Sequence, residues 1–295
     1  MDTRFIESFV VVAECGSVAE ASRRLNMTPS ALAQRIRVLE QDFGVSLLTR
    51  SGRFVRLTEA GTRLLTQAKL FRREVRKLKD AAMGEDFLGS LQIGCVRSSL
   101  SNVTSQFLNN AVTIHPSLTV LVEVGVSQDL YHQVAAGKLD AAFIVAPPFR
   151  IPKSLTWKSL RQEPLFVIAA HRLTGMTAHA VLANEPLIRY DRRGWGGSLA
   201  DQYLQEHRLQ PVERFELDSL DGILTLVEMD LGVSLMPNWV HPRPLPQGVI
   251  ALPLEVTAPS REIGMLWPAQ SPYSRLVEQI MMPHESKADD IHVDL

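Results

Sequence analysis

Apolar residues in the first forty positions recur at the spacing of amphipathic helices. Steps of three and four residues predict a first helix that ends at Gly16. A second helix is expected over residues 18–25. Thr28, as an N-cap followed by proline, begins a third helix that runs to about Glu40. Two short helices joined by a tight turn form a helix-turn-helix.

The third helix is predicted to have one apolar and one polar face. Leu32, Ile36 and Leu39 share the apolar face. The opposite face carries small or hydrogen-bonding side chains and no acid: Ser30, Ala33, Gln34, Arg37 and Gln41. Such a face suits the major groove of DNA, where Gln can pair with adenine and Arg with guanine. An ordinary solvated helix face is the alternative.

A basic hairpin is expected directly after this motif. Strands over 45–48 and 53–57 flank a turn at Ser51-Gly52, and no acid occurs between Asp42 and Glu59. Arginines on such a wing can reach phosphates or the minor groove, although an Arg-rich turn can also be plain surface. The expected DNA contacts are Thr28, Ser30, Ala33, Gln34, Arg37, Arg50, Arg53 and Arg56.

A proline-free stretch over 58–83 predicts one long helix with a heptad seam. The seam residues step by four and three: Leu64, Ala68, Phe71, Val75 and Leu78. This spacing is typical of a dimerisation helix, and packing on the chain's own body is the alternative. We expect residues 58–88 to be the linker helix and hinge between domains 1–60 and 89–295.

Strands and helices alternate over the last two hundred residues, which predicts right-handed crossovers and a mostly parallel sheet. Two strands, over 155–160 and 165–169, lead into a second α/β unit. A last helix over 273–282 is expected to pack back on the first unit. The predicted lobes, about 89–162 plus 268–284 and about 163–267, would leave a cleft between them.

Several polar residues follow predicted strands, where ligands of open α/β sheets bind. Ser98 and Ser99 precede a helix whose amides would face an anion, and Arg192 or Arg193 could pair with a carboxylate. Serines that only cap helices and solvated arginines are the alternatives. The run 194–197 is predicted to be only a turn. The candidate ligand contacts are Ser98, Ser99, Ser127, Ala146, Tyr190, Arg192 and Met236.

Composition narrows the class of protein. The 295 residues are 45% hydrophobic and 21% charged, and no apolar stretch approaches the roughly 18 residues that cross a bilayer. No membrane partner is expected. The start of the chain lacks a signal peptide's apolar core, and two cysteines cannot build a disulfide framework, so we expect a cytoplasmic protein.

Charge and motifs narrow the function. Residues 1–80 hold 15 Lys and Arg against 9 Asp and Glu, while the whole chain has a net charge of −1. A basic module on an acidic body points to a polyanion partner for the first part. The sequence has no metal-ligand spacing, nucleophile elbow or phosphate loop, so we expect no metal, no cofactor and no catalytic residue.

The run from Phe9 to Gly61 resembles the N-terminal domain of LysR-type transcriptional regulators. The matching positions are Phe9-x-x-Val12, Gly16-Ser17, Ala21, Leu25, Ala31-Leu32, Ile36-x-x-Leu39-Glu40, Phe43-Gly44, Leu47, Arg50, Val55 and Leu57-Thr58-Glu59-Ala60-Gly61. Ser22, Ala33 and Leu48 depart from the pattern. Ala33 stands where the family usually has Ser, so one phosphate or base contact is lost; the resemblance then implies DNA binding but not an exact operator preference.

The resemblance implies a winged helix-turn-helix, a long linker helix and a two-lobed α/β effector domain of the periplasmic-binding-protein type. It implies a regulator that binds double-stranded operator DNA and is modulated by a small-molecule effector, for which we expect a carboxylate. It also implies a homodimer or homotetramer, with RNA polymerase as a candidate partner. An enzyme acting on a carboxylate and a transport-type solute-binding protein are the alternatives from other classes.

Overall fold

The computed structural model describes residues 2–51, 54–83, 89–239, 244–254 and 258–282. Its contacts divide the chain into two compact units, Met1–Phe87 and Leu88–Leu295. Within the described residues, no helix is both long enough and apolar enough to cross a membrane.

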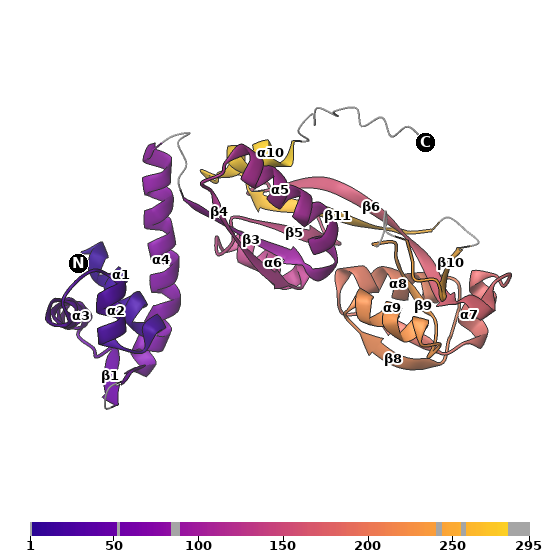
Figure 1. Cartoon of the computed structure of the whole chain (residues 1–295), viewed down its shortest axis with the longest axis horizontal. Coiled ribbons are helices and arrows are strands. Elements are labelled where there is room, and N and C mark those ends of the chain that lie inside the picture. The colour runs from indigo at the N-terminus through magenta and orange to yellow at the C-terminus, as the bar shows by residue number, and fades with distance from the viewer. Residues whose placement is uncertain (1, 52–53, 84–88, 240–243, 255–257, 283–295) are drawn as a thin grey trace, which may run out of the picture. The chain divides into compact units, whose positions relative to one another are not determined.

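The first unit consists of helices packed beside a small hairpin (Figure 1). Its elements are α1 (Thr3–Cys15), α2 (Val18–Arg24), α3 (Pro29–Phe43), β1 (Leu48–Ser51), β2 (Phe54–Leu57) and α4 (Glu59–Met83). The predicted order is confirmed, but α3 is longer than expected and β1 begins later. Gly44, in the left-handed conformation, ends α3. The Glu40 side chain then accepts hydrogen bonds from the backbone nitrogens of Leu47 and Leu48, which holds residues 44–47 outside the strand.

The first lobe of the second unit has parallel strands with helices packed against them. Its elements are β3 (Ser90–Val96), two short helical turns η1 (Arg97–Ser99) and η2 (Leu100–Thr104), α5 (Ser105–Ile114), β4 (Thr119–Gly125), α6 (Ser127–Ala135) and β5 (Ala141–Val145). Helix α10 (Ser274–Met281) returns to this lobe, where the Asn110 side-chain amide donates to the Ile280 carbonyl at 2.9 Å. The predicted packing of the last helix on the first lobe is confirmed.

The described part of the second lobe holds a small parallel pair of strands, three α-helices and one 3-10 turn, η3 (His171–Leu173). Its elements are α7 (Ala178–Asn184), β7 (Leu187–Tyr190), α8 (Trp195–Glu206), β8 (Glu213–Leu217), α9 (Leu220–Glu228), β9 (Ser234–Pro237) and β10 (Val249–Pro253). Helix α7 is an addition to the predicted elements. The prediction that 194–197 are only a turn is wrong, because Gly194 is the N-cap of α8 and residues 195–197 form its first turn. A Cβ at Gly197 would lie 1.9 Å from the Asp191 carbonyl oxygen, so glycine is needed for α8 to begin this close to the preceding chain.

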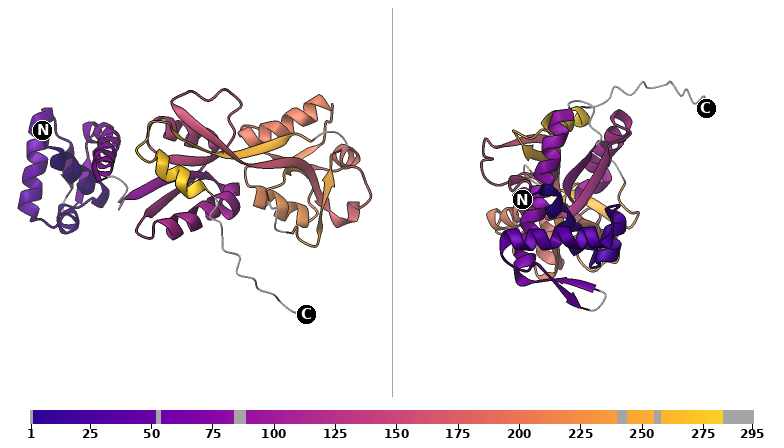
Figure 2. Two further views of the ribbon diagram at one scale, coloured as in Figure 1. Left: turned by 90° about the horizontal axis from the view of Figure 1, so that it is seen from above. Right: turned by 90° about the vertical axis from the view of Figure 1, so that its left-hand side faces the viewer.

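Two long antiparallel strands join the lobes (Figure 2). They are β6 (Leu155–Ala170), predicted as two separate strands, and β11 (Ser260–Pro268). The sheet order is β10-β6-β11-β5-β3-β4, with β9 also paired to β6. Only β3, β4 and β5 run parallel, so the prediction of a mostly parallel sheet is wrong for this sheet. The shift in register between Ile263 and Gly264 lets one continuous strand serve both lobes.

Candidate functional site

Helix α3 presents the polar face that the sequence predicts. Leu32 and Leu39 are fully buried and Ile36 nearly so, within a core that also contains Phe9 and Ala21. The side chains opposite them are exposed: Ser30, Gln34, Arg37 and Gln41. Ala33 is half-buried beside this face. The buried side fixes the rotation of the helix and leaves hydrogen-bonding groups outward.

The first turn of α3 is closed by Thr28. Its hydroxyl accepts a hydrogen bond from the Ala31 backbone nitrogen at 3.2 Å and lies 3.1 Å from the Ser30 hydroxyl. Thr28 is therefore an N-cap, as expected, and its exposed position also leaves it beside the polar face.

The hairpin after α3 pairs as an antiparallel ribbon in which Thr49 faces Arg56. Arg56 is exposed on β2. Arg50 lies on β1, but its side chain is not among the described ones, and Arg53 lies outside the described residues. The described part of the hairpin thus contributes one exposed arginine to a basic edge.

The heptad seam of α4 divides into two parts. Leu64 and Ala68 pack against the core of their own unit, and Ala68 is only 3% exposed. Further along, Phe71 and Leu78 are 39% and 71% exposed. Val75 between them is half-buried. The part of the predicted seam that is available to a partner therefore begins at Phe71.

The second unit contains a cavity of about 620 Å³ at the carboxyl ends of five strands. Strands β3, β4 and β5 approach it from the first lobe, and β7 and β8 approach it from the second. This is the position predicted for a ligand in an α/β sheet. Three predicted contacts line the cavity: Ser98, Ser127 and Tyr190.

The other predicted contacts are not among the lining residues. Ser99 is buried, and its hydroxyl donates to the Val96 carbonyl at 2.8 Å. Met236 is fully buried in an apolar cluster with Ile188 and Val227. Ala146, just past β5, follows the lining residue Val145 without itself lining the cavity.

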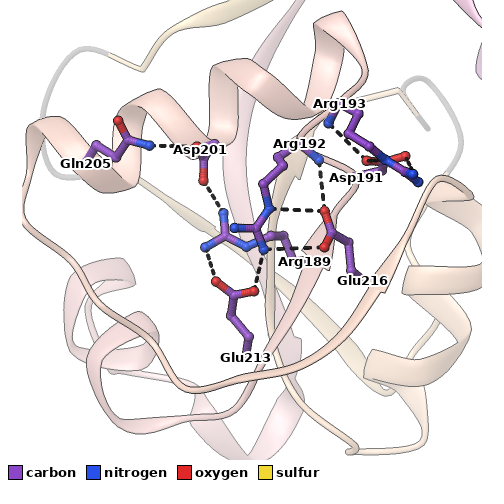
Figure 3. Close-up of polar contacts among 8 residues, drawn as sticks. All are labelled: Arg189, Asp191, Arg192, Arg193, Asp201, Gln205, Glu213 and Glu216. Carbon is purple, nitrogen blue, oxygen red and sulfur yellow. Dashed lines mark hydrogen bonds and ion pairs between the residues drawn. The ribbon is translucent and has the colours of Figure 1, made fainter.

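Arg192 is held by an ion network of the second lobe (Figure 3). Its guanidinium bonds to Glu216 and Glu213, and the hydrogen bonds from Arg192 lower the pKa of Glu216. Arg193 lines the cavity, but it is paired with Asp191, whose pKa that hydrogen bond lowers. The two predicted carboxylate-binding arginines thus already have carboxylate partners from the chain itself.

Two helices begin at the cavity without a side-chain cap. They are α6, after Val126, and α8, after Gly194. The first residues of both helices line the cavity, and they come from opposite lobes. Uncapped amides at a helix N-terminus favour a negative group. The first turn of α6 already carries one in Asp129, whereas the first turn of α8 carries no acid.

A buried ion cluster lies where the strands cross between the lobes. Arg261 of β11 and Glu163 of β6 face each other in the ladder, and each is 1% exposed. The Arg261 Nε donates to Glu163 Oε2 at 2.8 Å, and Arg161 Nε lies 3.2 Å from Glu163 Oε1. We call Arg161, Glu163 and Arg261 the crossing triad. It holds one more guanidinium than carboxylate.

Arg261 also links the two lobes through hydroxyl groups. Its Nη2 donates to the Ser98 hydroxyl and its Nη1 to the Tyr190 hydroxyl, both at 3.2 Å. Gly196 packs against this group, since a Cβ there would lie 2.8 Å from the Tyr190 hydroxyl oxygen. All four residues line the cavity.

The sequence analysis missed several charged lining residues: Arg97, Asp129, Asp218, Asp221 and Arg261. Asp218 follows β8, so the strand-end rule that selected Ser98 could have found it. Arg261 has no such signal, because it lies within strand β11 and not after the end of a strand.

Comparison with known proteins gives matches over both units. Residues 3–62 match the model of the bacterial regulatory helix-turn-helix protein, lysR family, and residues 84–281 match the LysR substrate binding domain.

Similar whole proteins cover most of the chain. The DNA-binding transcriptional dual regulator OxyR of Escherichia coli is 28% identical over 99% of this chain and 98% of its own length. The HTH-type transcriptional regulator ClcR of Pseudomonas putida is 27% identical over 81% and 84%. A hydrogen peroxide-inducible genes activator of Pectobacterium carotovorum is 29% identical over 95% and 94%.

Solved structures share the fold. Full-length CbnR in complex with its target DNA has a TM-score of 0.67 and 21% identity, and the comparison covers 95% of this chain and 99% of that one. Full-length BenM has a TM-score of 0.56 and 22% identity over 95% of both chains. A helix-turn-helix unit, a linker helix and an α/β binding domain are thus confirmed.

Proposed function

The chain belongs to the LysR-type family of transcriptional regulators, and we propose on that premise which residues read DNA, pair subunits and bind the effector. It is a DNA-binding regulator with an effector-binding domain, and not an enzyme. The acid-free polar face of α3, opposite three buried residues, carries the proposal for DNA reading. A DNA partner in turn favours a cytoplasmic location, with RNA polymerase as the candidate partner at the promoter.

We expect Gln34→Ala and Arg37→Ala each to reduce discrimination between operator and random DNA. Both side chains are exposed on the face that would enter the major groove. A good base contact contributes about 1–3 kcal/mol of discrimination, which corresponds to roughly 5-fold to 150-fold in relative affinity. Mobility-shift titrations on an operator fragment and on a scrambled fragment measure it.

Arg56→Ala is the matched control, because this arginine lies on the wing. If it contacts phosphate, its loss weakens binding to both fragments alike and flattens the salt dependence by about one unit of slope. Equal losses on both fragments for Gln34→Ala and Arg37→Ala would contradict base reading.

We propose that two copies pair through the distal half of α4. Phe71, Val75 and Leu78 continue the heptad seam beyond the part that packs on its own unit. Edge strands β4 and β8 offer further apolar surface, with Leu121 and Phe215 exposed. A dimer would set two winged modules at the spacing of a near-palindromic operator, and further pairing would give a tetramer.

We propose that the cavity of the second unit binds the effector and that the effector carries a carboxylate. The uncapped N-termini of α6 and α8 approach it from both lobes, and both would stabilise a bound anion. Effector binding would favour one arrangement of the lobes and thereby change promoter occupancy.

The peroxide response named for the Pectobacterium relative does not fit the one cysteine of this cavity-bearing unit. Cys95 is fully buried on β3, and burial raises the pKa of its thiol to about 11, although hydrogen bonds with Thr104 and Ser99 oppose that rise. The thiolate is the form that reacts with oxidants, and it is scarce at neutral pH for such a group.

We therefore expect Cys95 to resist alkylation in the folded protein. Iodoacetamide at pH 8 followed by peptide mass spectrometry should leave Cys95 unmodified until urea unfolds the chain. Cys15, which is half-buried in α1, provides the internal comparison. Rapid labelling of Cys95 in the native protein would reopen a redox role.

A further inference from the structure

We propose that the effector is a small amino acid whose carboxylate is bound at the Arg261 end of the cavity and whose ammonium group is bound by the cavity's aspartates. The inference rests on the proposed effector site and names its ligand class. It also assigns Arg261, which no motif indicated, as the residue that positions the carboxylate-binding groups of both lobes.

The crossing triad supplies an uncompensated positive charge. Glu163 is shared by Arg161 and Arg261, and within the described residues neither arginine forms an ion pair with another carboxylate. Arg161 is otherwise bonded to the Asn238 carbonyl, which is neutral. A buried excess charge is costly unless a counter-charge reaches it. Since Arg261 lines the cavity, a ligand carboxylate can be that counter-charge.

The hydroxyls of Ser98 and Tyr190 can donate hydrogen bonds to a carboxylate at the Arg261 end of the cavity. Each oxygen accepts a hydrogen bond from Arg261, so each hydroxyl hydrogen remains available to be donated to a ligand. Ser98 belongs to the first lobe and Tyr190 to the second, and both line the cavity. A carboxylate has two oxygens and can accept one bond from each lobe, which would favour the closed arrangement.

Another part of the same cavity favours a positive group on the ligand. Asp129 of α6 and Asp218 and Asp221 at the start of the α9 region also line it. Across the described ranges these three carboxylates form no ion pair, whereas Asp191 is neutralised by Arg193. Arg97 also lines the cavity without an ion pair among the described residues, but the three carboxylates outnumber it. A ligand with a carboxylate alone would therefore be repelled from their side of the cavity. A zwitterion satisfies both ends of the cavity.

An apolar side chain of the ligand would meet the indole of Trp195, which is supported by two further rings that do not themselves line the cavity. Trp195 lines the cavity, and its ring lies 6.0 Å from that of Tyr131 and 5.7 Å from that of Phe149, edge to face in both cases. Tyr131 and Phe149 come from the first lobe and Trp195 from the second. The preferred amino acid is therefore expected to have an apolar side chain.

The first experiment is isothermal titration calorimetry of the full-length protein with the twenty proteinogenic L-amino acids. The tightest binder is then compared with its 2-oxo acid, which lacks the ammonium group, and with its decarboxylated amine, which lacks the carboxylate. We expect each analogue to bind at least tenfold more weakly. Binding of the oxo acid or the amine as tightly as the amino acid, or no heat from any amino acid at 10 mM, overturns the proposal.

Variants assign the two ends separately. Tyr190→Phe removes only one hydrogen-bond donor. We expect it to weaken binding of the amino acid about tenfold, while the ratio of its affinity to that of the 2-oxo acid stays the same. The combined Asp129→Asn, Asp218→Asn and Asp221→Asn variant is expected to reduce that preference to less than threefold. Asp230→Asn, an exposed aspartate paired with Arg172 away from the cavity, is the matched control and should change neither value.

Arg261→Lys tests the positioning role. Lysine keeps the positive charge but lacks the two guanidinium nitrogens that donate to the Ser98 and Tyr190 hydroxyls. The affinity for the amino acid should therefore fall at least tenfold. In the double variant with Arg261→Lys, Tyr190→Phe should cause no further loss. Additive losses would overturn the positioning role. DNA binding is measured in the separate mobility-shift assay, because the calorimetry contains protein and amino acid but no DNA. A protein that binds amino acids but no operator refutes the proposed function and leaves this inference standing.

Discussion

Glu163→Gln is expected to lower the free energy of unfolding of the second unit by about 3–5 kcal/mol. The substitution leaves Arg161 and Arg261 without the carboxylate that they share, and Arg261 is 1% exposed, so water cannot replace it. Urea unfolding followed by tryptophan fluorescence reports on this unit, because Trp157, Trp195, Trp239 and Trp267 all lie within it.

The matched control for this prediction is Asp230→Asn, which removes the exposed carboxylate partner of Arg172. Exposed ion pairs contribute about 0–1 kcal/mol, so the midpoint should scarcely move. A loss below about 1 kcal/mol in Glu163→Gln would mean that water or a rearranged side chain compensates the arginines, and that the crossing triad is not a tightly buried cluster.

Gly61→Ala is expected to destabilise the first unit on the order of 3 kcal/mol. A Cβ at this position would lie 2.0 Å from the Leu47 carbonyl oxygen, which cannot move freely because it accepts a hydrogen bond from the Thr58 nitrogen. At an exposed helix position the same substitution stabilises the protein by about 1 kcal/mol. The sign of the change in stability therefore shows whether the clash with Leu47 is present. Amide hydrogen exchange of the α1–α3 peptides measures the change.

Thr66→Ala is the control for Gly61→Ala, since Thr66 is exposed on the same helix. Alanine there should leave the exchange of the α1–α3 peptides unchanged or slow it slightly. If Gly61→Ala also slows exchange, the close approach of α4 to Leu47 is not maintained in solution.

Local patterns predicted the DNA-binding unit well. The rotation of α3 follows from three apolar residues at helical spacing, and Thr28 caps it through a bond to a residue only three positions away. Such features need no knowledge of distant contacts. Leu64 and Ala68 show the limit, because spacing alone cannot tell whether a seam packs on its own unit or on a second copy.

The cavity of the second unit was harder to predict, because polar residues beside it interrupt the apolar pattern from which strands are predicted. Polar residues 161–163 split β6 into two predicted strands, but Arg161 and Glu163 are polar because they form the crossing triad with Arg261, which is almost a hundred positions away. The strand-end rule found Ser98, Ser127 and Tyr190. It also favoured Arg192, whose guanidinium is taken by Glu213 and Glu216 from another strand.

The packing of the first part of α4 against α1 has a mechanical consequence. Glu14 of α1 lies 3.5 Å from both Lys69 and Arg72, so α4 is held to the helices of its own unit as far as its middle. The part of α4 beyond Arg72 extends about 16 Å, and a tilt of about 10° there moves its end by roughly 3 Å. Because α3 shares the core on which the first part of α4 packs, a rotation applied at the far end of α4 would turn α3 together with the whole first unit.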